Sequence, residues 1–157
     1  MRCLLLALVA TGLFAANPEL VKVKSVYLLP MSNGMDQYLA NRLQDSSLYV
    51  VTTDPQAADA IFTDTLGPAF ERKFTELYPV PQEEDEEEPE PKEPERLSSF
   101  RKGRGMIFLV ERRTKQVVWS TYELPKNISS SSLDRAAQRI TERLRKSLDP
   151  KTAQASR

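Results

Sequence analysis

The chain has 157 residues, with 22 basic and 22 acidic side chains, no histidine and one cysteine at position 3. This length allows one domain of ordinary size with short appendages. The composition excludes an imidazole base, a zinc site of several cysteines or histidines, and a Ser-His-Asp triad. We therefore expect a protein that binds rather than catalyses, with no catalytic residue, no cofactor and no metal.

The formal net charge of zero is a cancellation between two segments of opposite charge. Residues 79–96 carry 9 acidic and 2 basic side chains, whereas residues 97–157 carry 14 basic and 5 acidic ones. Charge asymmetry of this kind indicates interaction surfaces rather than a particular fold.

Residues 1–16 have the order of a secretory signal peptide. A basic second residue precedes an apolar run from Cys3 to Phe14, which is too short to span a bilayer by itself. The pattern predicts an exported protein, periplasmic or envelope-associated, whose mature chain starts near Asn17. Because Cys3 stands at the start of the apolar run and not after it, it does not match the lipobox of a lipoprotein. The alternatives are an uncleaved membrane anchor and a buried N-terminal helix.

Hydrophobic periodicity and turn chemistry predict the elements of the first half. They are a strand at 21–29, an amphipathic helix at 35–45, a strand at 48–53, a helical turn after Asp54, a strand at 60–66 and a short helix at 69–78. Asp54 is a typical helix cap, and Pro55 suits the first helical position.

The acidic segment 79–96 interrupts this order. Five prolines and almost no apolar side chain leave it too little surface to bury against the cost of ordering. We expect a disordered loop inside a single domain spanning 17–149.

In the second half, a hairpin and a long helix are predicted. The strands cover 104–112 and 116–123 and turn at 113–115. The helix carries the strongest periodicity of the chain, an apolar stripe of Leu133, Ala136, Ala137, Ile140, Leu144 and Leu148. Ser131 and Asp134 resemble a capping box at its start. Pro150 ends it, and 150–157 is expected to be a flexible tail.

The element order is thus β-α-β-β-(acidic insert)-β-β-α. Two amphipathic helices can cover one face of a mixed sheet of about five strands, so the fold class expected is an α+β two-layer sandwich.

Several stretches of this order resemble a group of small bacterial envelope domains. They are MDQYLANRLQ, LYVVTTDP, AADAIFTDTLG and the hairpin stretch TKQVVWS, which contains Thr114, Val117, Val118, Trp119 and Ser120. The chain is similar over about 24–66 and 104–148 to the amino-terminal domain of TolB, to CsgG proteins and to LpoB-type activators. The resemblance implies a non-enzymatic role in binding envelope proteins. The missing lipobox and the acidic insert depart from that group.

Two sets of residues offer sites that we weigh against structural roles. Asp54, Asp59 and Asp64 recur every five residues, but no cation-binding loop spacing exists, so cap and strand-flanking roles are expected. Trp119 could stack a ligand; if Val117 and Trp119 face the helices, it is a core residue instead.

The remaining candidates are basic residues. They form one stripe on the last helix, at Arg135, Arg139, Arg143 and Lys146, and one group around the hairpin, at Arg101, Lys102, Arg104, Arg112 and Arg113. They are either a solvated face or a docking surface for an anionic partner. We expect no nucleic-acid binding, since no basic strand face is interleaved with aromatic residues.

These observations predict a non-enzymatic, exported bacterial cell-envelope protein that acts as a protein-interaction module. The alternative is a peripheral binder of anionic membrane surface through the basic C-terminal helix, masked by the protein's own acidic loop.

Overall fold

The computed structural model describes residues 18–79 and 105–149. A five-stranded sheet has the order β2-β1-β3-β4-β5. β1 (Ser25–Leu28) runs parallel to β2 (Val50–Val51) and β3 (Ala60–Thr63), while β4 (Met106–Glu111) is antiparallel to β3 and to β5 (Val117–Tyr122). The predicted α+β class with a five-stranded mixed sheet is confirmed.

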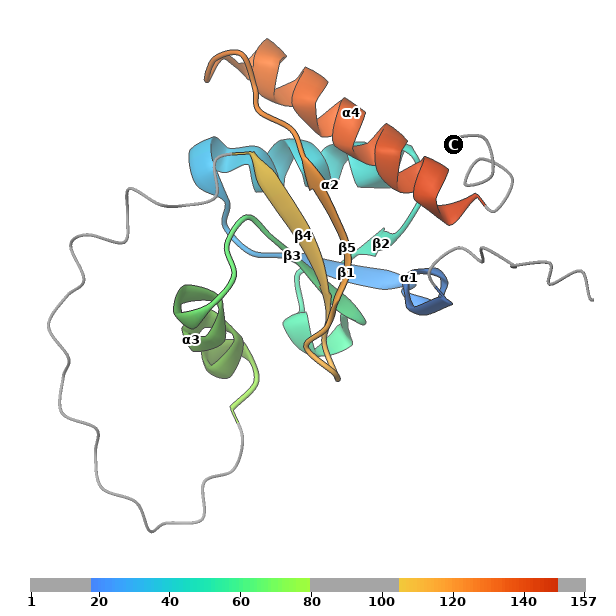
Figure 1. Cartoon of the computed structure of the whole chain (residues 1–157), viewed down its shortest axis with the longest axis vertical. Coiled ribbons are helices and arrows are strands. Elements are labelled where there is room, and N and C mark those ends of the chain that lie inside the picture. The colour runs from blue at the N-terminus through green and yellow to red at the C-terminus, as the bar shows by residue number, and fades with distance from the viewer. Residues whose placement is uncertain (1–17, 80–104, 150–157) are drawn as a thin grey trace, which may run out of the picture.

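Two long helices cover one face of this sheet. They are α2 (Met35–Asp45) and α4 (Ser130–Leu148), which lie together above the strands in Figure 1. The main core between helices and sheet contains Met35, Leu39, Leu43, Leu133, Ala136, Ala137, Ile140, Leu144, Val26, Ala60, Phe62, Ile107, Leu109 and Val118. The predicted stripe of α4 supplies five of these residues, and each large side chain so buried contributes about 2 kcal/mol of hydrophobic free energy.

The opposite face of the sheet carries a smaller cluster under α3 (Pro68–Leu77). Phe70 and Phe74 of this helix pack on Ile61 and Val110, with a ring-centroid distance of 5.7 Å between the two phenylalanines. Figure 1 shows α3 away from α2 and α4, on the far side of the strands. This short helix therefore covers β1, β3 and β4 on that face.

The chain enters the sheet through a helix that the sequence pattern does not predict. The expected strand at 21–29 begins only at Ser25, because residues Pro18–Lys22 form the short helix α1. Leu20 and Val23 are buried, whereas Val21 is 46% exposed. This i, i+3 spacing fits one helical turn, and the alternation of Val21 and Val23 that resembles a strand is accidental.

Two other strands are shorter than predicted. β2 has two residues instead of the six expected at 48–53, and β3 stops at Thr63 rather than Leu66. The predicted cap at Asp54 is confirmed, since its carboxylate accepts a hydrogen bond from the Gln56 amide at the start of the 3-10 turn η2 (Pro55–Ala57). A second 3-10 turn, η1 (Ser32–Gly34), precedes α2.

The predicted capping box of α4 is wrong. Ser129, not Ser131, is the N-cap, and its hydroxyl accepts from the Ser132 amide. Asp134 instead binds Arg42 of α2, with Arg42 Nε 2.8 Å from Asp134 Oδ1. A guanidinium partner outcompetes the local backbone because a charge-assisted, two-pronged hydrogen bond is stronger than a neutral one.

A β-bulge changes which residues of β5 face the core. Leu109 pairs with Trp119 and Val110 with Val117, so Val118 is the extra residue of the register shift. Val118 is buried in the main core, while Val117 is 44% exposed. The expectation that Val117 faces the helices is therefore wrong. Trp119 is half-buried against the core, and its indole N–H donates to the Ser147 hydroxyl at 3.0 Å.

Three sequence expectations lie outside the described residues. They are the signal peptide at 1–16, the acidic loop at 79–96 beyond Pro79, and the tail at 150–157. Within the described parts of the chain, no helix is both long and apolar enough to cross a membrane.

Candidate functional site

The recurring aspartates do not form a site. Asp59 accepts hydrogen bonds from the amides of Lys24 and Ser25, both at 2.9 Å, and thereby joins β1 to the start of β3. Burial alone would raise the pKa of Asp59, but these hydrogen bonds outweigh it and lower the pKa. Asp64 accepts from the amide and hydroxyl of Ser32. Among residues 18–79 and 105–149, no cluster of acidic, histidine or cysteine side chains could hold a metal ion.

One predicted basic residue of the hairpin, Arg112, lies beside the C-terminal end of α3. The Arg112 guanidinium donates to the Gln56 carbonyl and stands 5.6 Å from the centre of the Tyr78 ring. Arg113 is exposed, and it interacts with Glu111 within the turn. Arg101, Lys102 and Arg104 fall outside the described residues.

The basic row of α4 lies along β5, where two of its members share one carboxylate. Arg139 Nε is 2.6 Å from Glu123 Oε1, and Arg143 Nη2 is 2.8 Å from Glu123 Oε2. The Glu123 side chain is 9% exposed, whereas the two arginines are 42% and 46% exposed. A buried carboxylate thus holds two half-exposed guanidinium groups, and these three groups together carry a net charge of +1. We call Arg139 and Arg143 the arginine pair.

Arg143 also reaches the backbone of β5. Its Nη1 donates to the Tyr122 carbonyl at 2.5 Å and to the Thr121 hydroxyl at 3.2 Å. Arg135 and Lys146, the other members of the row, are exposed. The structure therefore separates the predicted basic residues: Arg139 and Arg143 lie on the helix-covered face beside β5, and Arg112 lies beside the C-terminal end of α3.

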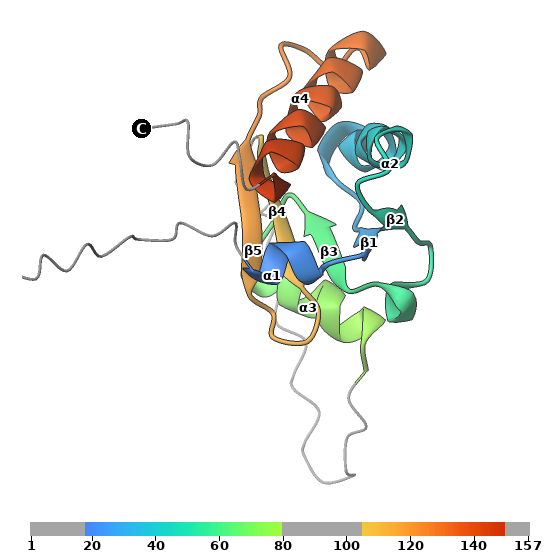
Figure 2. The same ribbon diagram turned by 90° about the vertical axis from the view of Figure 1, so that its right-hand side faces the viewer.

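β5 is one edge of the sheet, as Figure 2 shows, and it presents apolar side chains to solvent. Val117, Tyr122 and Leu124 are 44%, 56% and 51% exposed. The Glu123 amide donates to the Gly105 carbonyl, so the backbone groups of Glu123 point towards β4. Because directions alternate along a strand, those of Ser120 and Tyr122 point away from it. We call this outward side of residues 117–124 the β5 edge.

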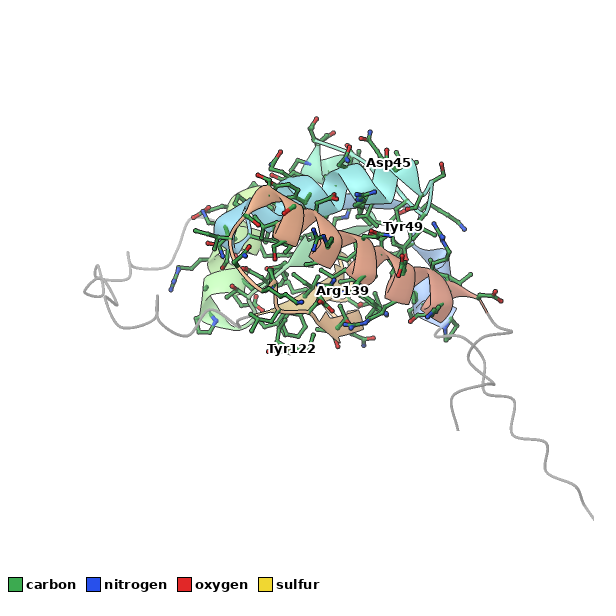
Figure 3. All side chains as sticks on the ribbon, turned by 90° about the horizontal axis from the view of Figure 1, so that it is seen from above. Asp45, Tyr49, Tyr122 and Arg139 are labelled. Atoms are coloured by element: carbon green, nitrogen blue, oxygen red, sulfur yellow. The ribbon has the colours of Figure 1, made fainter. Side chains whose placement is uncertain are left out.

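A groove lies on the other side of α4, between it and α2. Its volume is about 200 Å³, and it is lined by Arg42, Asp45, Ser46, Gln138, Thr141, Glu142 and Arg145. Two cations and two carboxylates make the lining neutral overall. Figure 3 separates the two regions, with Asp45 and Tyr49 on the α2 side of α4 and Arg139 and Tyr122 on the β5 side.

Tyr49 is the one described side chain with a buried polar atom that lacks a partner. It is 6% exposed in the main core, and its hydroxyl makes no hydrogen bond with the described residues. Burial raises the pKa of this phenol. Tyr49 lies in the main core and does not line the groove. Its hydroxyl therefore contributes to neither the groove nor the β5 edge.

Sequence inspection singled out the arginines but missed Glu123, the residue that positions them. A usable signal was present, because strand alternation puts Trp119, Thr121 and Glu123 on the side facing α4. Strand alternation does not predict, however, how close Arg139 and Arg143 lie to that carboxylate.

No family model, no curated protein and no solved structure matches the chain. The fold and the candidate site define an α+β domain in which no described strand pairs with the outer side of β5, an edge strand with exposed apolar side chains and a guanidinium pair beside it.

Proposed function

We propose that the chain is an exported, non-enzymatic protein-interaction domain of the bacterial cell envelope, and that its contact surface is the β5 edge. One observation carries this proposal: the last strand of the sheet exposes Val117, Tyr122 and Leu124, and the arginine pair flanks the same strand from the α4 side. Monomeric domains usually protect an edge strand with charges, prolines or short length. An edge with exposed apolar residues fits a contact surface.

The polar chemistry of the described residues supports binding rather than catalysis. The carboxylates with lowered pKa are Asp59, Glu111 and Asp134, and each has a structural hydrogen-bonding partner. At Asp134 the Arg42 hydrogen bond is the main cause, and it joins α2 to α4. At Asp59 and Glu111 burial opposes the shift, and hydrogen bonds from Ser25 and Thr114 outweigh it.

The second candidate is binding to anionic membrane surface through α4. It is favoured by the exposed cations Arg135, Arg145 and Lys146. The pairing of Arg139 and Arg143 with Glu123 weakens it, because that pairing turns half of the predicted stripe towards β5. Flotation of the full chain with phosphatidylglycerol vesicles distinguishes the two candidates. We expect no flotation at about 0.15 M salt, where exposed charges are screened beyond about 8 Å. Flotation that Lys146→Glu abolishes would favour the membrane candidate.

Site-specific photocrosslinking in cells tests the proposed surface. A photoreactive amino acid replaces Tyr122 on the β5 edge, or Asn41 on the exposed side of α2 as the matched control. We expect discrete crosslinked protein species from position 122 and none of them from position 41. Equal patterns from both positions, or no crosslinks from 122, would refute the proposed surface.

A further inference from the structure

We infer that the β5 edge accepts an extended, acidic segment of a partner protein as a sixth strand of the sheet. This inference rests on the proposed function and specifies the chemistry of its partner. Three features carry it: the direction of the β5 backbone groups, the difference between the two edges of the sheet, and the charge beside β5.

The first feature is a set of outward backbone groups with strand geometry. Ser120 and Tyr122 direct their N–H and C=O groups away from β4, as the Glu123–Gly105 hydrogen bond establishes for this register. An added strand pairs with such groups at every second residue, and main-chain hydrogen bonds then give the affinity. The Tyr122 carbonyl accepts from Arg143, and its second lone pair remains for a partner amide.

The second feature is the contrast between the edges. β2, at the opposite edge, has only two residues, and this short length limits strand addition there. β5 has six residues and contains neither proline nor a charged side chain. Its exposed apolar side chains, Val117 and Tyr122, supply contacts for alternate side chains of an added strand.

The third feature is the net positive charge that Arg139, Arg143 and Glu123 together place beside β5. Arg139 uses Nε for Glu123, and its two terminal nitrogens make no hydrogen bond with any described residue. A guanidinium held in place by a buried carboxylate is prepared for a second carboxylate, which it can bind with two parallel hydrogen bonds. Arg135 and Lys146, both exposed, extend the positive row along the helix.

This charge favours an acidic partner over a second copy of the chain. Pairing of two β5 edges would bring together two α4 rows, each with Arg135, Arg139, Arg143 and Lys146, in which Arg139 and Arg143 share the single carboxylate of Glu123. Like charges at short distance disfavour such an assembly. An acidic strand gains the same backbone hydrogen bonds and neutralises the row instead.

Selection of peptides on the full chain tests the inference without knowledge of the natural partner. The probe is a displayed library of random decapeptides, selected on the immobilised protein at about 0.05 M salt, where screening is weak. We expect enriched peptides to carry net negative charge, to be rich in β-branched residues and to lack proline. Enrichment of basic or proline-rich peptides, or no enrichment at all, would overturn the inference.

Two matched pairs of variants then locate the binding of the best peptide. Ser120→Pro removes an outward N–H and should weaken binding about tenfold, whereas Ser120→Thr keeps the N–H and should bind like the wild type. Arg139→Gln should weaken binding about tenfold, whereas Arg145→Gln, an equal loss of charge on the groove side, should not. Circular dichroism verifies that each variant is folded. If Ser120→Pro unfolds, the comparison of Arg139→Gln with Arg145→Gln still tests the inference. Equal affinity of Arg139→Gln and Arg145→Gln would contradict the inference.

The two proposals can fail separately. One outcome is that position 122 gives crosslinks while the selected peptides bind Ser120→Pro and Arg139→Gln as tightly as the wild type. That outcome would support the β5 edge as the contact surface and refute strand addition. A concentration-dependent dimer that Ser120→Pro dissociates would replace the acidic partner with a second copy. Absence of crosslinks from position 122 refutes the proposed function itself.

Discussion

The hydrogen bond between Trp119 and Ser147 fixes α4 over β5, and its removal gives a graded test of this packing. The indole N–H lies 3.0 Å from the Ser147 hydroxyl, which in turn donates to the Arg143 carbonyl. Trp119 is half-buried, so truncation to alanine loses only part of the 3–5 kcal/mol typical of a fully buried tryptophan, about 2 kcal/mol. Trp119→Phe keeps most of the ring contact and loses the hydrogen bond, for about 1 kcal/mol.

Ser147→Ala removes the same bond from the helix side. It should cost less than Trp119→Phe, because alanine has the higher helix propensity by a few tenths of a kcal/mol. Urea unfolding followed by circular dichroism measures all three variants and the double variant Trp119→Phe/Ser147→Ala. The cycle should yield a coupling energy of about 1 kcal/mol. Additive effects of the two single changes, or wild-type stability of Trp119→Ala, would refute the packing of α4 on β5.

Three further predictions follow from individual side chains and the N-terminus. Tyr49→Phe removes a buried hydroxyl without a described partner and should raise the free energy of unfolding by about 1 kcal/mol; a loss of stability would reveal a partner for the hydroxyl. Asp59 has a lowered pKa, so its hydrogen bonds to Lys24 and Ser25 stabilise the fold above about pH 4 and lose this effect as the pH falls through the folded pKa. The melting-temperature difference between wild type and Asp59→Asn should therefore shrink from about pH 6 to pH 3, and a constant difference would contradict that role. If the signal peptide is removed, N-terminal sequencing of the exported protein should begin near Asn17, whereas a chain beginning at Met1 would show that it is retained.

Much of the fold could be predicted because its strongest signals are local. The α4 stripe from Leu133 to Leu148 repeats at helical spacing over about four turns, and the helix forms at that position. Asp54 followed by proline specifies a capped turn through its own side chain and the next amides. Such features need no knowledge of distant residues.

The predictions that are wrong concern residues whose position depends on contacts with residues far away in the sequence. Asp134 belongs to a local capping pattern, yet Arg42, 92 positions away, captures its carboxylate. Val117 follows strand alternation, but pairing with β4 inserts Val118 as a bulge and shifts the core face by one residue. The site shows the same limit, since helical spacing identifies Arg139 and Arg143, whereas their orientation depends on Glu123 of another element.

The central claim is that β5 accepts an acidic segment as a sixth strand, and amide hydrogen exchange tests it most directly. Exchange is measured at β5 of the full chain, with and without the selected peptide. In the free protein, the outward amides of Ser120 and Tyr122 should exchange fast and that of Thr121, which points towards β4, should exchange slowly. The bound peptide should slow exchange at positions 120 and 122 about tenfold or more and leave position 121 unchanged. Unchanged exchange at both outward positions, with protection confined to the groove around Gln138 and Glu142, would contradict it.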